Sequence, residues 1–208
     1  MKWCPHCKKY VATSMDKTKL RAIKYLRFTY HCSECNGFIE SADQEGEKTM
    51  RKLKLYLDTS VWNFYFADDA PEKRDVTKDF IDLVRQEQYE VFISAVVVKE
   101  INDAPEPKRA QLVGLIKSCP VVELEITEAV DELAKSYIAR GILSEKKEDD
   151  ALHVAIATAT EMDALVSWNF QHLANLRKSE LFNGVNLERG YTKRLEMVTP
   201  MEVSKYES

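Results

Sequence analysis

The sequence predicts an α/β domain with a parallel sheet, preceded by a small metal-binding module. From residue 53 onward, short apolar runs alternate with stretches of helical periodicity, which is typical of a parallel sheet flanked by helices. Ahead of this pattern lie two Cys-x-x-Cys pairs, 24 residues apart. We therefore expect two domains: a zinc ribbon over 1–45 that includes the start of a linker, and an α/β domain over 53–203.

The composition of the 208-residue chain, with 45% hydrophobic residues, is that of a soluble globular protein. The longest apolar run, Val91 to Val98, is far shorter than the roughly 20 residues of a membrane span. The first ten residues also lack the apolar region of a secretory signal. We therefore expect a cytoplasmic protein that does not associate with a membrane.

Charge is divided unevenly along the chain. Residues 1–56 carry 12 Lys or Arg against 6 Asp or Glu, whereas the remaining residues carry 18 against 28. A basic module on an acidic body suits the binding of a polyanion. Lysines that merely keep a small domain soluble would explain the surplus equally well.

The two Cys-x-x-Cys pairs predict a structural zinc site. The cytosol keeps thiols reduced, so metal ligands are more plausible than disulfides in a chain without a secretion signal. Each pair lets both sulfurs reach one ion at about 2.3 Å, and two pairs complete a closed tetrahedral site. Such a site stabilises a segment that is too short to build much core. The expected Zn²⁺ ligands are Cys4, Cys7, Cys32 and Cys35.

These cysteines also allow other interpretations. Cys-Pro-His-Cys alone resembles the active-site motif of thioredoxin-like oxidoreductases, but that motif needs a preceding strand, for which Met1 leaves no room. His6 and His31 adjoin cysteines and offer alternative ligands, whereas Cys119 is expected to be a small buried hydrophobe. Between the pairs, basic and aromatic residues alternate, which suits RNA contact or else forms the module's own core.

The first elements of the α/β domain are predicted from local patterns. The polar stretch 40–52 has no apolar periodicity and predicts a linker. The apolar run 54–58 predicts the first strand. A helix is expected at 72–88, with Phe80 and Val84 on its apolar side.

The middle of the domain follows the same alternation. The run 91–94 predicts a buried second strand, and 95–101 should turn into a short helix. Pro105 is expected in the first turn of a helix to residue 117, where the N–H that proline lacks is not needed. Residues 121–125 predict a further strand.

The last elements are marked by caps and by continuous apolar runs. Thr127 and Gly141 predict the ends of a helix over 127–140. The mostly apolar stretch 149–162 predicts a buried helix, and 164–167 the next strand. After a helix or loop, a short strand is expected near residues 195–198.

Three acidic residues lie where an α/β fold gathers its chemistry, at or just beyond the carboxyl ends of strands. Asp58 ends the first strand, and Glu100 lies on the short helix after the second. Asp150 opens the buried helix, where the helix dipole favours a negative charge. Clustered carboxylates repel one another and a phosphate substrate, so the cluster makes sense around cations. Hard oxygen ligands point to Mg²⁺ or Mn²⁺.

These motifs resemble a PIN domain over residues 54–203. They are KLYLDTS with Asp58, SAVVVKEI with Glu100, DDALHVAIATA with Asp150, and ALVSWNFQHL, in this order. The resemblance implies a Rossmann-like parallel sheet and a metal-dependent endoribonuclease that leaves a 5′-phosphate and a 3′-hydroxyl. The toxins of VapBC-type toxin–antitoxin pairs are members of this family, which implies RNA as substrate, an antitoxin as partner and a homodimer. By the same match, Asp58, Glu100 and Asp150 are the metal ligands.

The sequence departs from the family at one catalytic position. Where an aspartate commonly follows the strand, this chain has Asn169. Its carbonyl oxygen can still face a metal ion or a neighbouring water, but it brings no charge. A second ion is therefore expected to bind weakly or only with substrate. Asp149 and Asp163, which could compensate, are interpreted as solvated charges at helix ends.

Ser60 and His153 are candidates for contacts around the metal ligands. His153 lies three residues after Asp150 on the same helix face and could bond a ligand carboxylate or the scissile phosphate. A lone histidine on an apolar helix is more often a satisfied core residue. Ser60 could bond water beside the metal or cap the following segment. His172 and Asn175 could line the cleft or cap a short helix there.

Three functions are compatible with these observations. The leading hypothesis is an endoribonuclease, either a toxin or an RNA-processing enzyme guided by its zinc module. The second is a non-catalytic RNA- or ribosome-binding protein whose acidic pocket has decayed, with Asn169 as the first loss. Against decay, a dead site has no physical reason to keep buried carboxylates together. The third is a structure-specific DNA nuclease.

Overall fold

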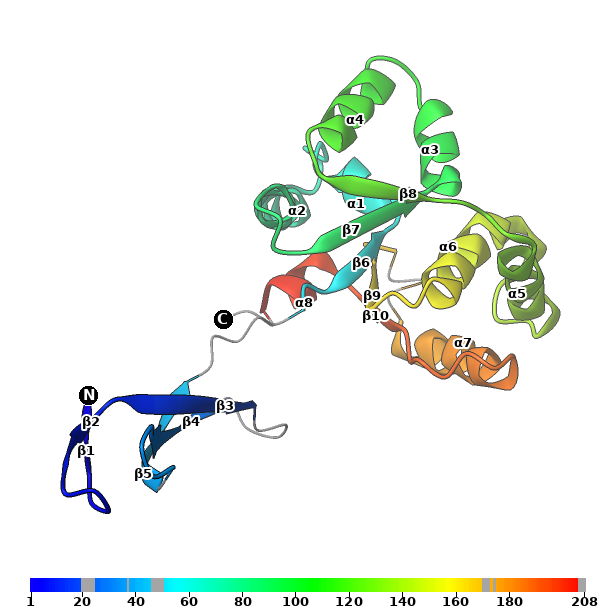
Figure 1. Ribbon diagram of the computed structural model, residues 1–208. Coiled ribbons are helices and arrows are strands. Elements are labelled where there is room, and N and C mark those ends of the chain that lie inside the picture. The colour runs from blue at the N-terminus through cyan, green and yellow to red at the C-terminus, as the bar shows by residue number, and fades with distance from the viewer. Residues whose placement is uncertain (20–24, 37, 46–50, 170–172, 174, 206–208) are drawn as a thin grey trace. The chain divides into compact units, whose positions relative to one another are not determined.

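The computed structural model in Figure 1 describes residues 1–19, 25–36, 38–45, 51–169, 173 and 175–205. The chain divides into two compact units, Met1–Arg51 and Lys52–Ser208. Within the described residues, no helix has the length and apolar character that crossing a membrane requires.

The first unit is built from antiparallel strands. A two-stranded hairpin pairs β1 (Lys2–Cys4) with β2 (Lys9–Val11). A three-stranded sheet follows in the order β3 (Thr13–Lys19), β4 (Tyr25–Cys32) and β5 (Phe38–Glu45). One cysteine pair begins at the end of β1 and the other at the end of β4, so that each pair occupies a turn.

Two expectations for this unit are wrong. Residues 40–45 were assigned to a linker, but they belong to β5, which pairs with β4 from Tyr25↔Glu45 onward. An antiparallel strand is held by backbone hydrogen bonds to its neighbour, and these bonds leave no trace in apolar periodicity. A short strand, β1, also leads into the cysteine turn and ends at Cys4. Because a hairpin partner rather than a helix follows the cysteine turn, the thioredoxin-like interpretation still fails.

The second unit contains a five-stranded sheet in which every neighbouring pair is parallel. Its strands, in spatial order, are β10 (Glu196–Val198), β9 (Ala164–Val166), β6 (Lys54–Leu57), β7 (Glu90–Ser94) and β8 (Val121–Leu124). The central strand β6 is covered on both faces, so Leu55, Tyr56 and Leu57 are fully buried. The predicted Rossmann-like α/β sheet is thereby confirmed.

Helices cover both faces of this sheet. They are α1 (Thr59–Phe64), α2 (Pro71–Arg85), α3 (Ala95–Asn102), α4 (Lys108–Lys117), α5 (Glu128–Ala139), α6 (Glu148–Ala159), α7 (Leu176–Glu188) and α8 (Pro200–Lys205). Figure 1 shows α5, α6 and α7 on one side of the sheet, and α2 and α8 on the other. Helix α5 is capped at Thr127 as predicted, and Gly141 beyond its end takes the left-handed conformation that favours glycine, with φ +70°.

Some helix boundaries differ from those predicted. Helix α4 begins at Lys108 rather than at Pro105. A residue that precedes proline is disfavoured in the helical region, so Glu106 in front of Pro107 delays the regular helix. The short helices α1 and α8 were not anticipated, because six residues are too few to show a helical period.

Asp163 is not the solvated charge that was expected. Its Oδ2 accepts a hydrogen bond of 2.8 Å from the backbone N–H of Lys54, and its Oδ1 lies 2.8 Å from Nζ of Lys193. The side chain is only 14% exposed. Asp163 therefore ties the starts of β6 and β9 together, at the sheet edge opposite the strands' carboxyl ends. Asp149 fits its prediction, since its side chain is 44% exposed. Its Oδ1 lies 3.6 Å from Nζ of Lys99, which is exposed as well.

We predict that Asp163→Ala lowers the free energy of unfolding of the second unit by about 1–3 kcal/mol, because a buried backbone N–H loses its acceptor. Urea unfolding followed by circular dichroism measures this change. Asp149→Ala is the matched control and should cost less than about 1 kcal/mol, as is usual for an exposed ion pair. Equal losses in the two variants would contradict the anchoring role of Asp163.

Candidate functional site

The candidate site lies where the sheet reverses its direction of winding. From β6 the chain adds β7 and β8 on one side, and then returns to add β9 and β10 on the other. In open α/β sheets, the crevice outside the carboxyl ends of strands at such a reversal is the usual ligand site. Asp58 follows β6 directly, and Ser167 with Asn169 follows β9.

Asp58 is buried and fully engaged by hydroxyl and amide donors. It is the N-cap of α1, and its Oδ1 accepts hydrogen bonds from the backbone N of Ser60 (3.0 Å) and from Ser60 Oγ (2.5 Å). Its Oδ2 accepts one from Ser167 Oγ at 2.6 Å. Burial raises the pKa of Asp58, and the opposing effects of His153, Ser167 and Ser60 do not cancel that shift. Helix α1 is therefore capped by Asp58 and not by Ser60.

Glu100, on α3, is held through one of its two oxygens. Thr59 Oγ1 donates a hydrogen bond to Oε2, and His153 Nε2 lies 3.2 Å from the same atom. Burial alone would raise the pKa of Glu100, but the hydrogen bonds from His153 and Thr59 outweigh it, and the pKa is lowered. No described residue donates a hydrogen bond to Oε1, so this oxygen remains available to a ligand.

Asp150 has the same arrangement in the first turn of α6. Its Oδ1 accepts a hydrogen bond of 3.2 Å from the side-chain amide of Asn169. Its Oδ2 is buried and has no hydrogen-bond partner among the described residues. Nζ of Lys147 lies 3.6 Å from this same oxygen, beyond hydrogen-bond distance. A buried carboxylate oxygen without a donor is costly unless a cation approaches it.

Contacts join Asp58 to Glu100, and Glu100 to Asp150. Thr59, the residue after Asp58, donates to the Glu100 carboxylate. His153 bonds the same carboxylate and lies one helical turn after Asp150 on α6. The carboxyl end of β6, α3 and the start of α6 therefore meet around Glu100.

The end of β9 closes the connection between Asp58 and Asp150. Ser167 donates its hydroxyl to Asp58 and accepts the backbone N–H of Asn169 at 2.9 Å. Asn169 in turn donates to Asp150. The three acidic side chains thus border one region, and neutral donors connect them.

His153 lies within the field of all three carboxylates. Burial alone would lower its pKa, but the hydrogen bond to Glu100 and the charges of Asp58, Glu100 and Asp150 raise it overall. The imidazole is 3% exposed, as expected of a core histidine, yet it also bonds a proposed metal ligand. Both roles considered for His153 are therefore combined in one side chain.

The acidic residues are spaced more widely than the cysteines. Among the described residues, one group of His, Cys, Asp or Glu side chains has three or more ligand atoms within 4.8 Å of one another, and that group is the four cysteines. A Mg²⁺ ion usually keeps several waters and takes only one or two carboxylates directly. An ion held by these residues would therefore reach part of the carboxylate set through water.

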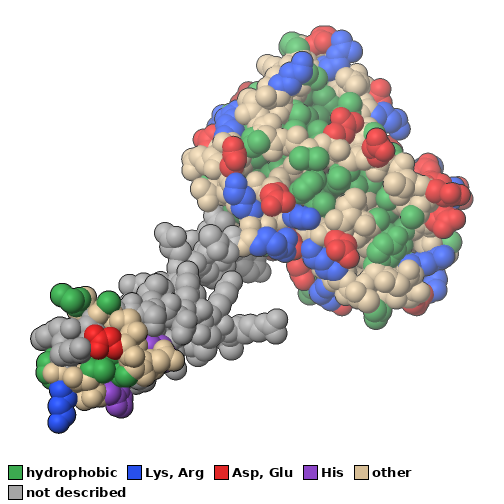
Figure 2. Space-filling view, viewed as in Figure 1, with side chains coloured by type: hydrophobic (Ala, Val, Ile, Leu, Met, Phe, Trp, Pro, Cys, Tyr) green, Lys and Arg blue, Asp and Glu red, His purple; other side chains and the backbone are tan. Residues whose placement is uncertain are grey.

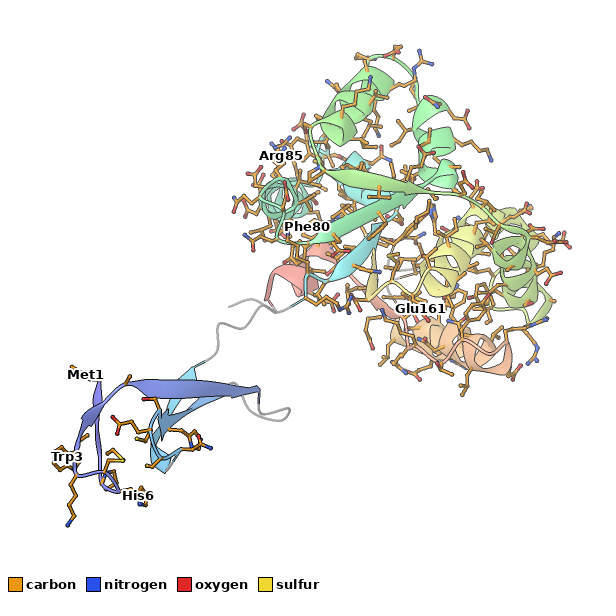
Figure 3. The ribbon with its side chains drawn as sticks, viewed as in Figure 1. Met1, Trp3, His6, Phe80, Arg85 and Glu161 are labelled. Atoms are coloured by element: carbon orange, nitrogen blue, oxygen red, sulfur yellow. The ribbon has the colours of Figure 1, made fainter. Side chains whose placement is uncertain are left out.

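The four cysteines of the first unit form a compact cluster. The Sγ atoms of Cys4 and Cys35 lie 3.8 Å apart, and those of Cys7 and Cys32 lie 3.7 Å apart. Four sulfurs at about 2.3 Å from a central ion would be separated by about 3.8 Å in a regular tetrahedron. Figure 3 shows sulfur atoms gathered beside His6, at one end of the module.

Backbone amides stabilise negative charge on this cluster. The N–H of Cys7 donates to Sγ of Cys4 at 3.3 Å, and that of Glu34 donates to Sγ of Cys32 at 3.4 Å. Backbone hydrogen bonds, above all the one from Cys35, lower the pKa of Cys32 to about 7. The side-chain hydrogen bond with Cys35 raises the pKa of Cys7 to about 12. A cation at the four sulfurs would favour deprotonation of all of them.

Two residues of the site were not singled out from the sequence. Thr59 and Ser167 carry the hydroxyls that hold Glu100 and Asp58, and their only local signal is that each adjoins an expected strand end. Asn175 accepts from the backbone N–H of Lys178 and caps α7, as one alternative had it. His172 lies outside the described residues.

The family comparison bears directly on this geometry. The profile of the PIN domain matches residues 55–174, which is more than half of the chain. The chain belongs to the PIN domain family. Members of this family are nucleases, hydrolases that cleave phosphodiester bonds. No curated protein matches the chain.

Solved structures similar to this PIN domain protein include VapC toxins. One is Mycobacterium tuberculosis VapC20, a sarcin–ricin loop cleaving toxin, at 18% identity and TM-score 0.45, over 57% of this chain and 92% of that chain. Another is VapBC2 from Rickettsia felis, bound to a DNA fragment from the promoter of this protein pair. It matches at 14% identity and TM-score 0.42, over 70% of this chain and 98% of that chain.

We predict that Ser167→Ala lowers the free energy of unfolding by about 1–3 kcal/mol, because a buried carboxylate loses a donor and Asn169 loses an acceptor. Ser136→Ala is a suitable control: that serine is also buried, but its hydroxyl donates only to the carbonyl of Glu132 within α5. It should cost less than about 1 kcal/mol. Chemical denaturation without divalent ions measures both, and equal losses would contradict the support of Asp58 by Ser167.

Proposed function

We propose that this PIN domain is a divalent-metal-dependent endoribonuclease, with Asp58, Glu100 and Asp150 as ligands of Mg²⁺ or Mn²⁺. One observation carries the proposal: three acidic side chains border the sheet's reversal point, and two of them have an oxygen that accepts no hydrogen bond from the described residues. Mutual repulsion and desolvation oppose such an arrangement unless a cation offsets them. Hard carboxylate oxygens match the ligand preference of Mg²⁺ and Mn²⁺.

The number of ions follows from the charge of the site. Asn169 donates its amide to Asp150 and contributes no negative charge. We propose that Asn169 orients Asp150, in addition to the direct metal contact expected of its carbonyl oxygen. One tightly held ion is expected, with a second dependent on oxygens of the substrate phosphate.

The residues around the carboxylates would prepare the site for hydrolysis. Bound Mg²⁺ or Mn²⁺ would supply Lewis-acid polarisation of the phosphate and a more acidic attacking water. Ser60 and Ser167 hold the Asp58 carboxylate from both sides, while Thr59 fixes Glu100. Preset ligand positions of this kind reduce the reorganisation that the reaction requires.

We assign the first unit a zinc ion and a part in binding RNA or a partner protein. The sulfur spacings near 3.8 Å and the N–H···S bonds support the zinc ion. Residues 1–51 carry 10 Lys or Arg against 6 Asp or Glu, and this basic surplus supports contact with a polyanion. On the face of the second unit seen in Figure 2, acidic and basic side chains are mixed, so that face adds no strong field of one sign. The basic and aromatic side chains between the cysteine pairs lie largely outside those that the structure describes.

The biological setting is proposed from family membership. VapC-type toxins are PIN domain proteins, so a type II toxin with an antitoxin partner is one assignment, and a cytoplasmic RNA-processing enzyme is the other. A homodimer is proposed on the same ground. A short antitoxin-like reading frame beside the gene would favour the toxin, and light scattering of the purified chain would test the dimer.

We predict that Asp58→Asn lowers Mn²⁺-dependent cleavage of a mixed RNA pool by more than about 100-fold, since even changes beside a metal ligand typically cost about 10- to 100-fold. The variant should stay folded by circular dichroism, and EDTA should abolish wild-type cleavage. Asp149→Asn removes a neighbouring exposed carboxylate and should retain activity. Full activity of Asp58→Asn would refute the ligand assignment.

Two further measurements separate this proposal from its alternatives. An assembled metal site predicts that millimolar Mn²⁺ raises the melting temperature, whereas a decayed, non-catalytic RNA-binding domain would show no such stabilisation. Parallel digestion of RNA and DNA oligonucleotides distinguishes a ribonuclease from a structure-specific DNA nuclease.

We predict one Zn²⁺ per chain, detected by elemental analysis of protein purified without chelator. Cys35→Ser should reduce the bound zinc to well below one equivalent, because the closed set of four ligands is lost. Cys119→Ser changes a buried cysteine of the second unit and should leave the zinc content unchanged. Zinc affinity should fall as the pH falls, since the thiols must lose protons to bind. Equal zinc contents in both variants would contradict the assignment.

A further inference from the structure

A buried series of hydrogen bonds lies behind the Glu100 carboxylate. Tyr56 Oη is 2.7 Å from Ser94 Oγ and also 2.7 Å from His153 Nδ1. The other ring nitrogen of His153 faces Glu100 Oε2 at 3.2 Å. Tyr56 and Ser94 are fully buried and His153 is 3% exposed, so the series is shielded from solvent. It connects side chains of β6, β7, α6 and α3.

The donors and acceptors of this series are compatible with one direction. The backbone N–H of Val96 donates to Ser94 Oγ at 3.2 Å, which leaves the Ser94 hydrogen free to point to Tyr56. Tyr56 can then donate to Nδ1 of His153, so that Nε2 carries the hydrogen that faces Glu100. If the ring is instead doubly protonated, Nε2 still donates to Glu100. The contact with the carboxylate is therefore the same in both states.

The two nitrogens of His153 are both engaged within the protein. Nδ1 faces Tyr56 and Nε2 faces Glu100, so the ring has no nitrogen left for a phosphate or a metal ion. Such an imidazole can act on the reaction only through the carboxylate it holds. A group that hydrogen-bonds a metal-ligating side chain typically controls the orientation of that side chain and its affinity for the metal.

We propose that Ser94, Tyr56 and His153 form a positioning relay that holds Glu100 by Oε2 and leaves Oε1 directed to the metal. Thr59 donates to the same Oε2, so both contacts restrain one oxygen and spare the other. Tyr56 is the decisive member, because its hydroxyl holds Nδ1 while Nε2 faces Glu100. The relay rests on the proposed metal-dependent function and adds three positioning residues to it.

Tyr56→Phe tests the relay, and Tyr137→Phe is its matched control. Both tyrosines are fully buried, and the hydroxyl of each is hydrogen-bonded to a polar side chain. Tyr137, on α5, donates to Asn186 of α7 at 2.5 Å. Each variant keeps the ring and loses one buried hydroxyl, so the two should lose similar stability. Only Tyr56→Phe should weaken Mn²⁺ binding, by about 10-fold or more. Tyr137→Phe should stay within about 2-fold of wild type.

Mn²⁺ affinity is measured by electron paramagnetic resonance of free Mn²⁺ with the full-length protein, independently of cleavage. A second pair of variants tests the donor itself. His153→Gln keeps an N–H that can reach Glu100 and should bind Mn²⁺ more tightly than His153→Leu. A merely structural role for His153 predicts no such order.

The outcomes separate the relay from the function on which it rests. Wild-type protein that binds Mn²⁺ and a Tyr56→Phe variant that binds it equally well would overturn the relay alone. Equal weakening in Tyr56→Phe and Tyr137→Phe would also overturn it, because the loss would then reflect stability. Absence of Mn²⁺ binding by the wild-type protein would overturn the proposed function and, with it, this role of the relay.

Discussion

Negative charge held out of water at the end of a parallel sheet is the constraint on which the second unit depends. Asp58 is 4% exposed and surrounded by donors, and Asp150 has a buried oxygen that accepts no hydrogen bond within the described part of the chain. Buried carboxylates are tolerated only where hydrogen bonds or cations offset their lost hydration. The neutral donors Thr59, Ser60 and Ser167 meet part of that need, and the remainder is the physical basis for proposing a divalent ion.

The fold makes this concentration of charge possible at little cost elsewhere. Strands β6 and β9 run parallel and side by side, so the residues that follow them emerge at the same edge although they are far apart in the chain. Below that edge, β6 packs fully buried apolar side chains on both faces. The apolar sheet thus supplies a rigid support, and its carboxyl edge carries the polar groups.

The first unit differs from the second in its buried core. The buried hydrophobic residues described there are Cys4 and Cys32 of the sulfur cluster. A unit of this size gains little from apolar burial, so the proposed zinc ion would supply much of its stability. The two units would thus use metal ions in opposite ways: a closed sulfur site for folding, and an open oxygen site for chemistry.

Local sequence patterns alone determined the cysteine pairs, the apolar strands and the order of Asp58, Glu100 and Asp150, because spacing and periodicity act within a few residues. They failed where a distant partner decides: β5 exists through its pairing with β4, and Asp163 accepts a hydrogen bond from the backbone of Lys54. Only the tertiary structure brought Ser167 to Asp58 and Tyr56 to His153, across 109 and 97 residues of chain. Hydrogen bonds between side chains depend on positions that the whole fold sets, and no local pattern encodes them.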